Sequence, residues 1–344
     1  MRRARQVLSL LACALLLSGC QKEPVEGTTF AMDTVMSVTL YGGWDREQTK
    51  EVRDWMLGRL GWLDGLLSAV DGDGDLPTLN RAGGQPVEVS ERVSELLDRA
   101  LELCEITGGA LDVTAYPAIK AWGFTEEEHR VPSPAELAEL AAKIDYAAVE
   151  VEGETVALPA GMEIDLGAVA KGYAGDVLAE TARANDISSA LLDLGQSTIV
   201  AVGGKPGGKP WRVGIVDPAR PGSYFAVVEL ADMAMGTSGG YQRYFEQDGV
   251  RYWHILDPDT AAPARSGLSS VTVVSPSALT CDGLSTALFV MGLEEGADFW
   301  REHPELEFEA VFVTEDGGIY RTSGLEGRFS LAKGYEDREV TVLE

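Results

Sequence analysis

The sequence has 344 residues, of which 55 are acidic and 28 are Lys or Arg, giving a formal net charge of −27 at pH 7. This excess of negative charge argues strongly against nucleic acids and anionic lipid surfaces as ligands of the protein body, because both would be repelled. A polyanionic small ligand would need local help from a cation or from backbone N–H groups. The length suits one large domain or two intimately packed halves.

The first 19 residues have the pattern of a signal peptide. Arg2, Arg3 and Arg5 form a basic start, and the apolar run at 7–17 is too short for a comfortable membrane span. The run leads into LSGC at 17–20, which resembles the lipobox of bacterial lipoproteins and implies cleavage before Cys20 and lipid attachment to its thiol. The alternative is an ordinary secretory signal with a chance cysteine. Cleavage would remove three arginines and no acid, changing the net charge from −27 to −30.

We therefore expect three segments: a signal peptide at 1–19, a lipidated cysteine with its tether at 20–27, and a folded domain at 28–344. No later run of the sequence is apolar for long enough to span a bilayer. The expected attachment to the membrane is through the lipid anchor alone, with the body facing the periplasm of a bacterial cell envelope.

Two cysteines remain after the signal peptide and the lipidated residue are set aside. Cys104 and Cys281 could pair, or both could stay reduced. Two cysteines in a chain of this length do not make a disulfide framework, so two buried thiols are favoured.

Hydrophobic periodicity predicts strands and helices in irregular alternation. In the first part of the chain we expect a strand at 34–41, helices at 46–69, 93–107 and 134–144, and an irregular segment at 112–124. In the second part we expect a strand pair within 149–164, helices at 167–185 and 281–291, and strands at 191–202, 211–216, 224–230, 252–256, 270–274 and 308–313. Hairpins outnumber clean βαβ units, so the predicted fold class is α+β with mixed or antiparallel sheets.

Three short motifs resemble known sites without meeting their requirements. The acidic run at 71–75 opens like an EF-hand loop, but Leu76 stands where the turn glycine is needed. The glycine-rich run at 203–209 starts like a P-loop, but Pro210 follows it and a strand is expected next. The run at 236–240 fits G-x-S-x-G around Ser238, and residues 241–245 could start a short helix. The acids between that serine and the next histidine are too near for the usual triad, so a serine hydrolase remains a minor alternative.

Other residues indicate phosphate chemistry assisted by a metal. Residues 162–176 read as strand, tight turn and helix, with Lys171 in the first helical turn, where free N–H groups favour a phosphate. The alternative is an ordinary helix with a solvated lysine. Asp282 and Thr286 are four residues apart on one helix face, two hard oxygen ligands suited to Mg²⁺. His254, one of three histidines, is a candidate base because imidazole has a pKa of about 6.5, although it could instead be a structural residue beside a turn.

Taken together, these blocks resemble the ApbE family, the FAD:protein FMN transferases. The matches run in family order over most of 28–320: MDT at 32–34, ALDVT at 110–114, WGF at 122–124, the block at 165–176, DLG at 193–195, WRVGI at 211–215, TSG at 237–239, HILDP at 254–258 and DGLST at 282–286. The sequence departs from the family pattern at Asp33, where glycine is usual, and also at 71–79, 195–197 and 260–262.

The resemblance implies a single T-fold-like globule that transfers FMN from FAD to a threonine or serine hydroxyl in a short acceptor motif of a partner flavoprotein, with AMP leaving. It implies Mg²⁺ held by Asp282, Thr286 and the backbone carbonyl of Ala168, with His254 as the catalytic base. The residues that it implies contact FAD are Met32, Ala110, Leu111, Asp112, Asp165, Lys171 and Ile255. Two alternatives share every motif: hydrolysis of FAD to FMN and AMP, and flavin binding without catalysis.

Overall fold

The computed structural model describes residues 23–344 except 44, 71, 127 and 221. The expected signal peptide, Cys20 and the first part of the expected tether lie outside the described residues. The end of that tether is already folded, because strand β1 (Val25–Ala31) begins at Val25. In the described part of the chain, no helix is both long enough and apolar enough to cross a membrane.

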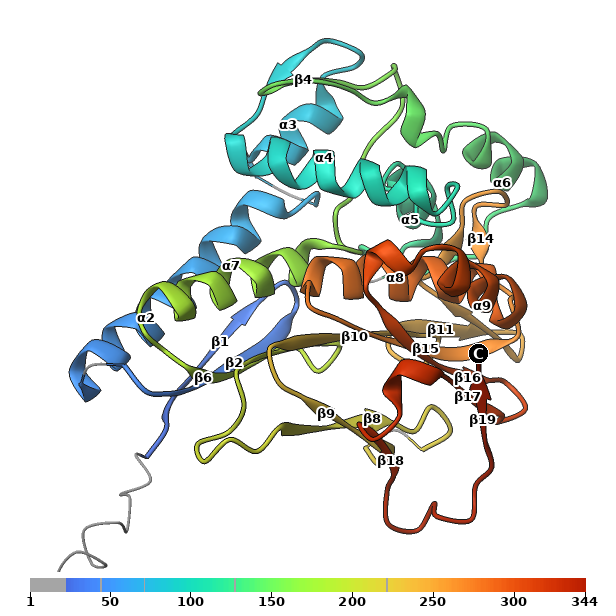
Figure 1. Ribbon diagram of the computed structural model, residues 1–344. Helices are drawn as coiled ribbons and strands as arrows, with labels where there is room; N and C mark the ends of the chain where they lie inside the picture. The colour runs from blue at the N-terminus through green and yellow to red at the C-terminus, as the bar shows by residue number, and fades with distance from the viewer. Residues whose placement is uncertain (1–22, 44, 71, 127, 221) are drawn as a thin grey trace, which may run out of the picture.

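A large sheet forms the centre of the molecule (Figure 1). Within the described residues it has nine strands in the order β1, β2, β6, β7, β10, β15, β16, β17, β19, and the last pair alone is parallel. The strands after β1 are β2 (Thr34–Tyr41), β6 (Ser189–Leu194), β7 (Thr198–Val202), β10 (Met233–Gly239), β15 (Leu268–Ser275), β16 (Glu309–Thr314), β17 (Ile319–Thr322) and β19 (Val340–Leu343). Every residue of β7 is buried, because both faces of the sheet are covered there.

Helices cover one face of this sheet. Helix α7 (Ala170–Ala184) packs on β6 and β7, and α8 (Ala278–Met291) packs beside it on β10 and β15 (Figure 1). The two helices approach closely at Gly172, where a Cβ atom would lie 2.3 Å from the carbonyl oxygen of Ala278. Helix α2 (Arg46–Leu67) packs on β1, and α9 (Leu293–Glu302) follows α8.

A smaller sheet covers the opposite face. It contains β8 (Trp211–Val216), β9 (Tyr224–Leu230) and β18 (Phe329–Leu331) in the order β18, β9, β8. Its apolar side chains, including Trp211 and Phe225, form a core with Ile199 and Ala201 of β7.

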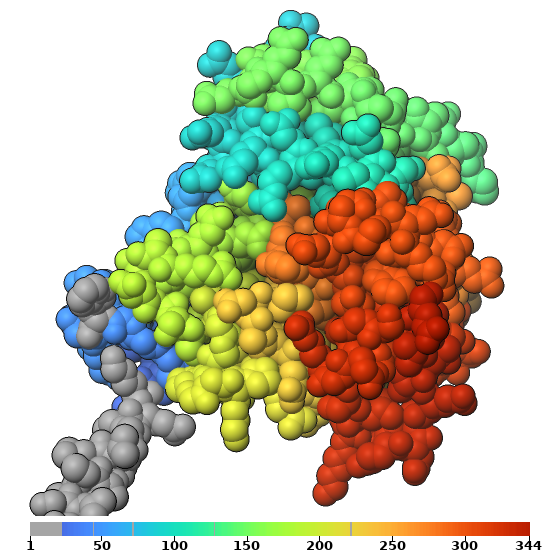
Figure 2. All heavy atoms as spheres, viewed as in Figure 1, coloured from blue at the N-terminus to red at the C-terminus, as the bar shows by residue number. Residues whose placement is uncertain are grey.

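A third part lies beyond α7 and α8 and is in contact with the rest of the molecule in Figures 1 and 2. It comprises helices α3 (Asp75–Arg81), α4 (Glu91–Ile106), α5 (Tyr116–Trp122) and α6 (Pro134–Ala141), with the small sheet β3 (Val87–Glu88), β5 (Thr155–Ala157) and β4 (Glu150–Glu152). One continuous apolar core runs from α4 through α8 to the large sheet. The remaining elements are the hairpins β11 (Tyr244–Gln247) with β12 (Val250–Trp253) and β13 (Leu256–Asp257) with β14 (Ala262–Pro263), and short 3₁₀ turns at Tyr146–Ala148, Pro304–Leu306 and Ser323–Leu325.

The predicted α+β class is confirmed, and several local predictions are wrong. The segment at 112–124, expected to be irregular, contains α5, which has a proline in its first turn and ends at Gly123 with a φ of 81°. Residues 241–245, which could have started a short helix after Ser238, do not form one, since Tyr244 begins β11. The strand pair predicted within 149–164 is present, as the antiparallel strands β4 and β5 of three residues each. Helix α7 begins at Ala170 and α8 at Ala278, close to the expected positions.

The two cysteines are both buried and unpaired, as favoured from the sequence. Burial raises the pKa of the Cys104 thiol to about 12 and raises that of Cys281 well above its ordinary value. Both side chains therefore serve as small apolar core residues at neutral pH.

Candidate active site

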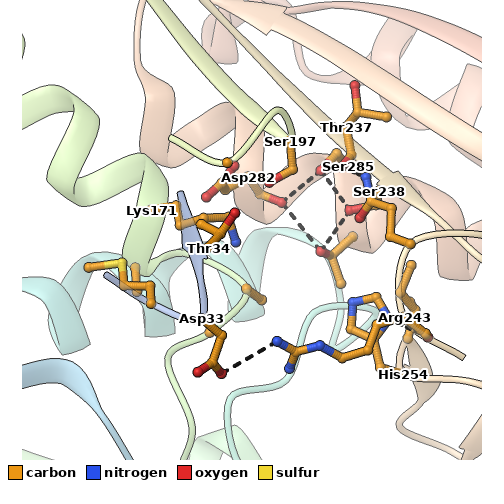
Figure 3. A pocket seen from close by; sticks show the side chains of 18 of the residues that line it. Asp33, Thr34, Lys171, Ser197, Thr237, Ser238, Arg243, His254, Asp282 and Ser285 are labelled. Carbon is orange, nitrogen blue, oxygen red and sulfur yellow. Dashed lines mark hydrogen bonds and ion pairs between the residues drawn. The ribbon is translucent and has the colours of Figure 1, made fainter. Parts of the chain in front are cut away.

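A single cavity of about 1250 Å³ brings the candidate residues together. Its walls come from the β1–β2 turn, the α4–α5 segment, the start of α7, the central strands, α8 and the segment after β12. Every candidate that lies in the described residues lines it: Met32, Ala110, Leu111, Asp112, Asp165, Ala168, Lys171, His254, Ile255, Asp282 and Thr286. Figure 3 shows Asp282 and Lys171 in one part of this cavity and His254 with Arg243 in another.

Asp282 is buried on α8 and held from two sides. Its Oδ2 atom accepts a hydrogen bond of 2.7 Å from the backbone N–H of Gly172, and its Oδ1 atom accepts one of 2.6 Å from the Thr198 hydroxyl. Burial raises the pKa of this carboxyl, and the positive charge of Lys171 is the largest opposing effect. The carboxylate therefore has a fixed orientation in a place where a negative charge needs a cation.

The start of α7 is less open to a phosphate than the sequence predicts. The N–H of Gly172 donates to Asp282, and the N–H groups of Val169 and Ala170 both donate to the carbonyl of Leu166. These groups are consequently occupied. The ammonium group of Lys171 therefore supplies most of the positive potential expected at the helix start.

The hydroxyl groups of Ser285 and Thr286 donate hydrogen bonds to the backbone carbonyl of Asp282 at 3.0 and 3.4 Å. Figure 3 shows Ser238 next to Ser285. The Ser238 Oγ atom is 2.8 Å from Ser285 Oγ and 3.2 Å from Thr286 Oγ1. The sequence interpretation included Thr286 and missed Ser285, although positions three and four residues after Asp282 share its helix face. Ser238, the nucleophile of the serine-hydrolase alternative, lies inside β10 with no strand–turn–helix elbow, so that alternative lacks its required geometry.

These oxygen atoms suit a hard cation. Among the described residues there is no cluster of three or more His, Cys, Asp and Glu side chains able to hold a metal ion. The expected Mg²⁺ ligands are instead one carboxylate, one hydroxyl and one carbonyl, from Asp282, Thr286 and Ala168. A partial oxygen set of this kind fits Mg²⁺, which commonly completes its coordination with water and substrate phosphate oxygens.

His254 follows β12 and is oriented by the carbonyl oxygen of Arg243. That oxygen lies 3.2 Å from the backbone nitrogen of His254 and 3.1 Å from its Nδ1 atom. A carbonyl only accepts hydrogen bonds, so Nδ1 carries the ring proton and Nε2 keeps a free lone pair. Burial, followed by the positive charges of Arg243 and Lys171, lowers the pKa of His254 to about 4. The ring is neutral at pH 7, and its pKa lies below the ordinary value expected from the sequence.

Two of the residues expected to contact the flavin also make hydrogen bonds that hold the backbone around them. The Asp112 carboxylate accepts hydrogen bonds from the backbone and hydroxyl of Thr114 at 2.8 and 2.6 Å and from the backbone of Tyr146 at 3.0 Å. It therefore fixes the shape of the loop that begins at Ala110. The backbone N–H of Asp165 donates to the carbonyl of Val113 at 2.9 Å, and burial raises the pKa of the Asp165 carboxyl.

The β1–β2 turn presents Met32 to the cavity in a strained conformation. Ala31 pairs with Thr34, leaving a two-residue turn in which Met32 and Asp33 have φ values of 50° and 59°. Both values lie in the left-handed region required by a type I′ hairpin turn, where glycine or asparagine is usual. Strain of this kind is commonly retained at ligand sites.

The chain matches known proteins over most of its length. The ApbE family profile matches residues 32–312. The FAD:protein FMN transferase of Treponema pallidum is 37% identical over 281 residues, covering 76% of this chain and 77% of that protein, and the Vibrio cholerae protein of the same name is 34% identical over 333 residues, covering 91% and 95%. Among solved structures, the ApbE protein of Thermotoga maritima has a TM-score of 0.83 at 32% identity, covering 88% of this chain and 98% of that chain. The flavin transferase ApbE of Vibrio cholerae has a TM-score of 0.77 at 30% identity, covering 89% and 99%. Sequence and fold agree, and the chain belongs to the ApbE family.

Proposed function

We propose that this protein transfers FMN from FAD to a threonine or serine hydroxyl of another protein and releases AMP. The observation that carries the proposal is that a neutral His254 with a free Nε2 lines the same cavity as Lys171 and the oxygen ligands of α8. The names of the relatives, FAD:protein FMN transferase, support this choice of substrate and reaction.

In the proposed reaction the acceptor hydroxyl oxygen attacks the FMN-side phosphorus of FAD. A new phosphoester bond forms there, and the bond from that phosphorus to the bridging oxygen breaks, so AMP leaves with the bridging oxygen. Nε2 of His254 accepts the hydroxyl proton and later releases it to solvent. An incoming diphosphate brings negative charge beside the imidazole, which raises its pKa from about 4 and makes it a better base.

We propose Asp282, Thr286 and the Ala168 carbonyl as the residues that hold Mg²⁺. When bound there, the ion supplies charge neutralisation and polarisation of the diphosphate. The Lys171 ammonium group adds a positive charge from α7. Its effect on the Asp282 carboxyl is the largest of the influences that lower that pKa, which supports placing Lys171 near the same anion.

We also propose that Cys20 anchors the protein to a membrane of the cell envelope, facing the periplasm. The support is the LSGC pattern at 17–20 and the short distance in sequence between Cys20 and the first strand at Val25. At roughly 3.5 Å per residue, such a tether would hold the fold within about 20 Å of the lipid. The attachment is tested by metabolic labelling of the full chain with a fatty acid and by loss of the label in Cys20→Ala.

The activity is tested with the form beginning at Gln21, incubated with FAD, Mg²⁺ and a protein carrying a threonine in an acceptor motif. Transfer predicts AMP release only in the presence of acceptor, together with an FMN-sized gain in acceptor mass. His254→Ala should abolish both signals while retaining FAD binding. Equal release of AMP and free FMN without acceptor would instead identify a hydrolase, and FAD binding without cleavage would refute the catalytic role of His254.

A further inference from the structure

An ion pair joins two walls of the cavity. The guanidinium group of Arg243 reaches from the turn after β10 toward the β1–β2 turn, where its Nη2 atom lies 3.5 Å from Oδ2 of Asp33 (Figure 3). Both side chains line the cavity and remain accessible, with 53% of the Arg243 side chain and 81% of the Asp33 side chain exposed. An accessible pair at this distance is weak and easily exchanged for another partner.

The charged side chains around the cavity are mostly acidic, so the positive charge of Arg243 matters for the binding of an anionic ligand. Among the described residues that line it, there are seven carboxylates and only two Lys or Arg side chains, Lys171 and Arg243. These carboxylates disfavour a ligand that carries a diphosphate, whereas the two cations favour it. Asp33 neutralises one of the two.

We propose that Arg243 is a second phosphate-binding cation beside Lys171, and that Asp33 is an internal counter-ion that competes with the phosphates for its guanidinium group. The inference rests on the proposed function, because it takes FAD as the source of the diphosphate. When the ligand binds, the Arg243 side chain exchanges its carboxylate partner for phosphate oxygens, and the Asp33 carboxylate becomes solvated. This competition sets the affinity for the anionic ligand.

The geometry allows this exchange without moving the backbone carbonyl that orients the base. Arg243 orients His254 through its backbone carbonyl, whereas the proposed exchange moves only its side chain. The guanidinium fork suits two phosphate oxygens at once. Its positive charge already lowers the pKa of His254 and of Asp165, which shows that its field reaches both the base and the far wall.

The role of Asp33 also agrees with its position in the turn. Its φ of 59° is left-handed, a conformation that glycine adopts most readily and that asparagine and aspartate adopt occasionally. The turn leaves the Asp33 carboxylate exposed and within 3.5 Å of the Arg243 guanidinium group, where it can pair with the arginine or be exchanged for another anion.

The test compares ligands with and without phosphates on the purified form beginning at Gln21, with Mg²⁺ and without acceptor. FAD and ADP carry the diphosphate, and riboflavin carries none. Arg243→Gln should weaken FAD and ADP binding about tenfold, while Asp33→Asn should strengthen both about threefold. Riboflavin binding should stay unchanged in both variants.

Arg183 and Asp232 provide a matched control. Their side chains form an ion pair of the same 3.5 Å length with 49% and 64% exposure, and Asp232 also has a left-handed φ, of 50°. Neither residue lines the cavity. Arg183→Gln and Asp232→Asn remove the same charges and should leave the affinities for FAD and ADP unchanged.

The possible results separate the inference from the proposed function. If Arg243→Gln weakens riboflavin binding as much as FAD binding, the arginine is structural and the proposal fails. If Asp33→Asn leaves ADP affinity unchanged or lowers it, the counter-ion role fails. If the wild-type protein binds ADP but not FAD, the proposed substrate is wrong, and the ADP comparison still decides the role of Arg243.

Discussion

The carboxylate of Asp282 on α8 accepts a 2.7 Å hydrogen bond from the backbone N–H of Gly172 on α7. This contact joins the two helices that cover the large sheet, and it orients the side chain proposed to bind Mg²⁺. It requires a close approach, since a Cβ atom at Gly172 would lie 2.3 Å from the Ala278 carbonyl oxygen and 2.6 Å from Leu279 Cα. Helix packing and the orientation of Asp282 therefore depend on the same glycine.

Gly172→Ala should destabilise the protein strongly. The new methyl group meets backbone atoms of α8, which cannot move aside as a flexible side chain could, and overpacking of this kind costs about 3 kcal/mol. The free energy of unfolding, measured in urea, checks the prediction.

Gly61→Ala in α2 is the matched control. A Cβ atom there meets nothing within 4 Å, and the glycine is exposed within a helix. Alanine should stabilise that helix by about 1 kcal/mol through its higher helix propensity. Equal urea midpoints for Gly172→Ala and the wild-type protein would contradict the close approach of the helices.

Asp282→Asn should remove the stabilising effect of Mg²⁺ without unfolding the protein. Burial raises the pKa of this carboxyl above its unfolded value, so ionisation at neutral pH costs stability in the folded state. A bound cation relieves that cost, and an uncharged amide has no such cost. We expect Mg²⁺ to raise the melting temperature of the wild-type protein and to leave that of Asp282→Asn unchanged.

Thr286 offers a finer comparison at the same site. Thr286→Ser keeps the hydroxyl proposed to bind Mg²⁺, whereas Thr286→Val replaces it with a methyl group of similar size. Mg²⁺ affinity, measured by calorimetry in the presence of ADP, should fall about tenfold or more in the valine variant and stay near the wild-type value in the serine variant. Equal affinities in the two variants would remove Thr286 from the metal site.

His254 should titrate far below an ordinary histidine. Its pKa of about 4 keeps the ring neutral above about pH 5 in the free protein, so kcat/KM for transfer, which reports the free enzyme, should fall through this group only near pH 4. Between the unfolded pKa of about 6.5 and the folded value, only the unfolded chain binds the proton, so this residue lowers stability as pH falls through that window.

The three histidines of the chain make the titration measurable by NMR. The imidazole signal missing from His254→Gln identifies the residue, and its midpoint should lie near pH 4 in the free protein and higher when ADP is bound. A midpoint near 6.5 without ligand would show that the ring is solvated and that the cavity does not lower its pKa.

The contrast between Asp282 and Arg243 shows which residues of the candidate site can be predicted from the sequence and which cannot. Asp282 and Thr286 could be paired from the sequence because helical spacing alone places them on one face. The contact between Arg243 and Asp33 joins a turn after β10 to the β1–β2 turn, and no local pattern records which turns meet. The same limit applies to Ser238, which reaches Thr286 only because β10 lies under α8.

The fold shows the same difference between features that a local sequence pattern predicts and features that depend on contacts between distant segments. Helices α2, α4, α7 and α8 follow apolar positions at helical spacing, and their predicted positions are close to those observed. Helices α3 and α5 have seven residues each, too few for a periodic pattern, and were missed. The order of the strands depends on pairing between distant segments, which periodicity does not specify.

Asp176 holds the first turn of α8, the helix that carries the proposed Mg²⁺ ligands. Its carboxylate accepts hydrogen bonds from the Ser277 hydroxyl at 2.9 Å and from the backbone N–H groups of Ala278 and Leu279 at 2.7 and 3.2 Å. These N–H groups have no partner within the helix, and a carboxylate at a helix start also meets a favourable dipole. Asp176→Asn leaves one acceptor oxygen in place of two and should cost about 2 kcal/mol of stability.

The same substitution should weaken Mg²⁺ binding, because α8 carries both Asp282 and Thr286. Glu180→Gln is the control: it removes one negative charge from an exposed position on the same helix as Asp176. Urea unfolding and Mg²⁺ titration of both variants distinguish the effect of losing a negative charge from the effect of losing the capping hydrogen bonds. If the two variants lose the same stability, net charge explains the effect; if Asp176→Asn alone loses both stability and Mg²⁺ affinity, the position of α8 is set by this carboxylate.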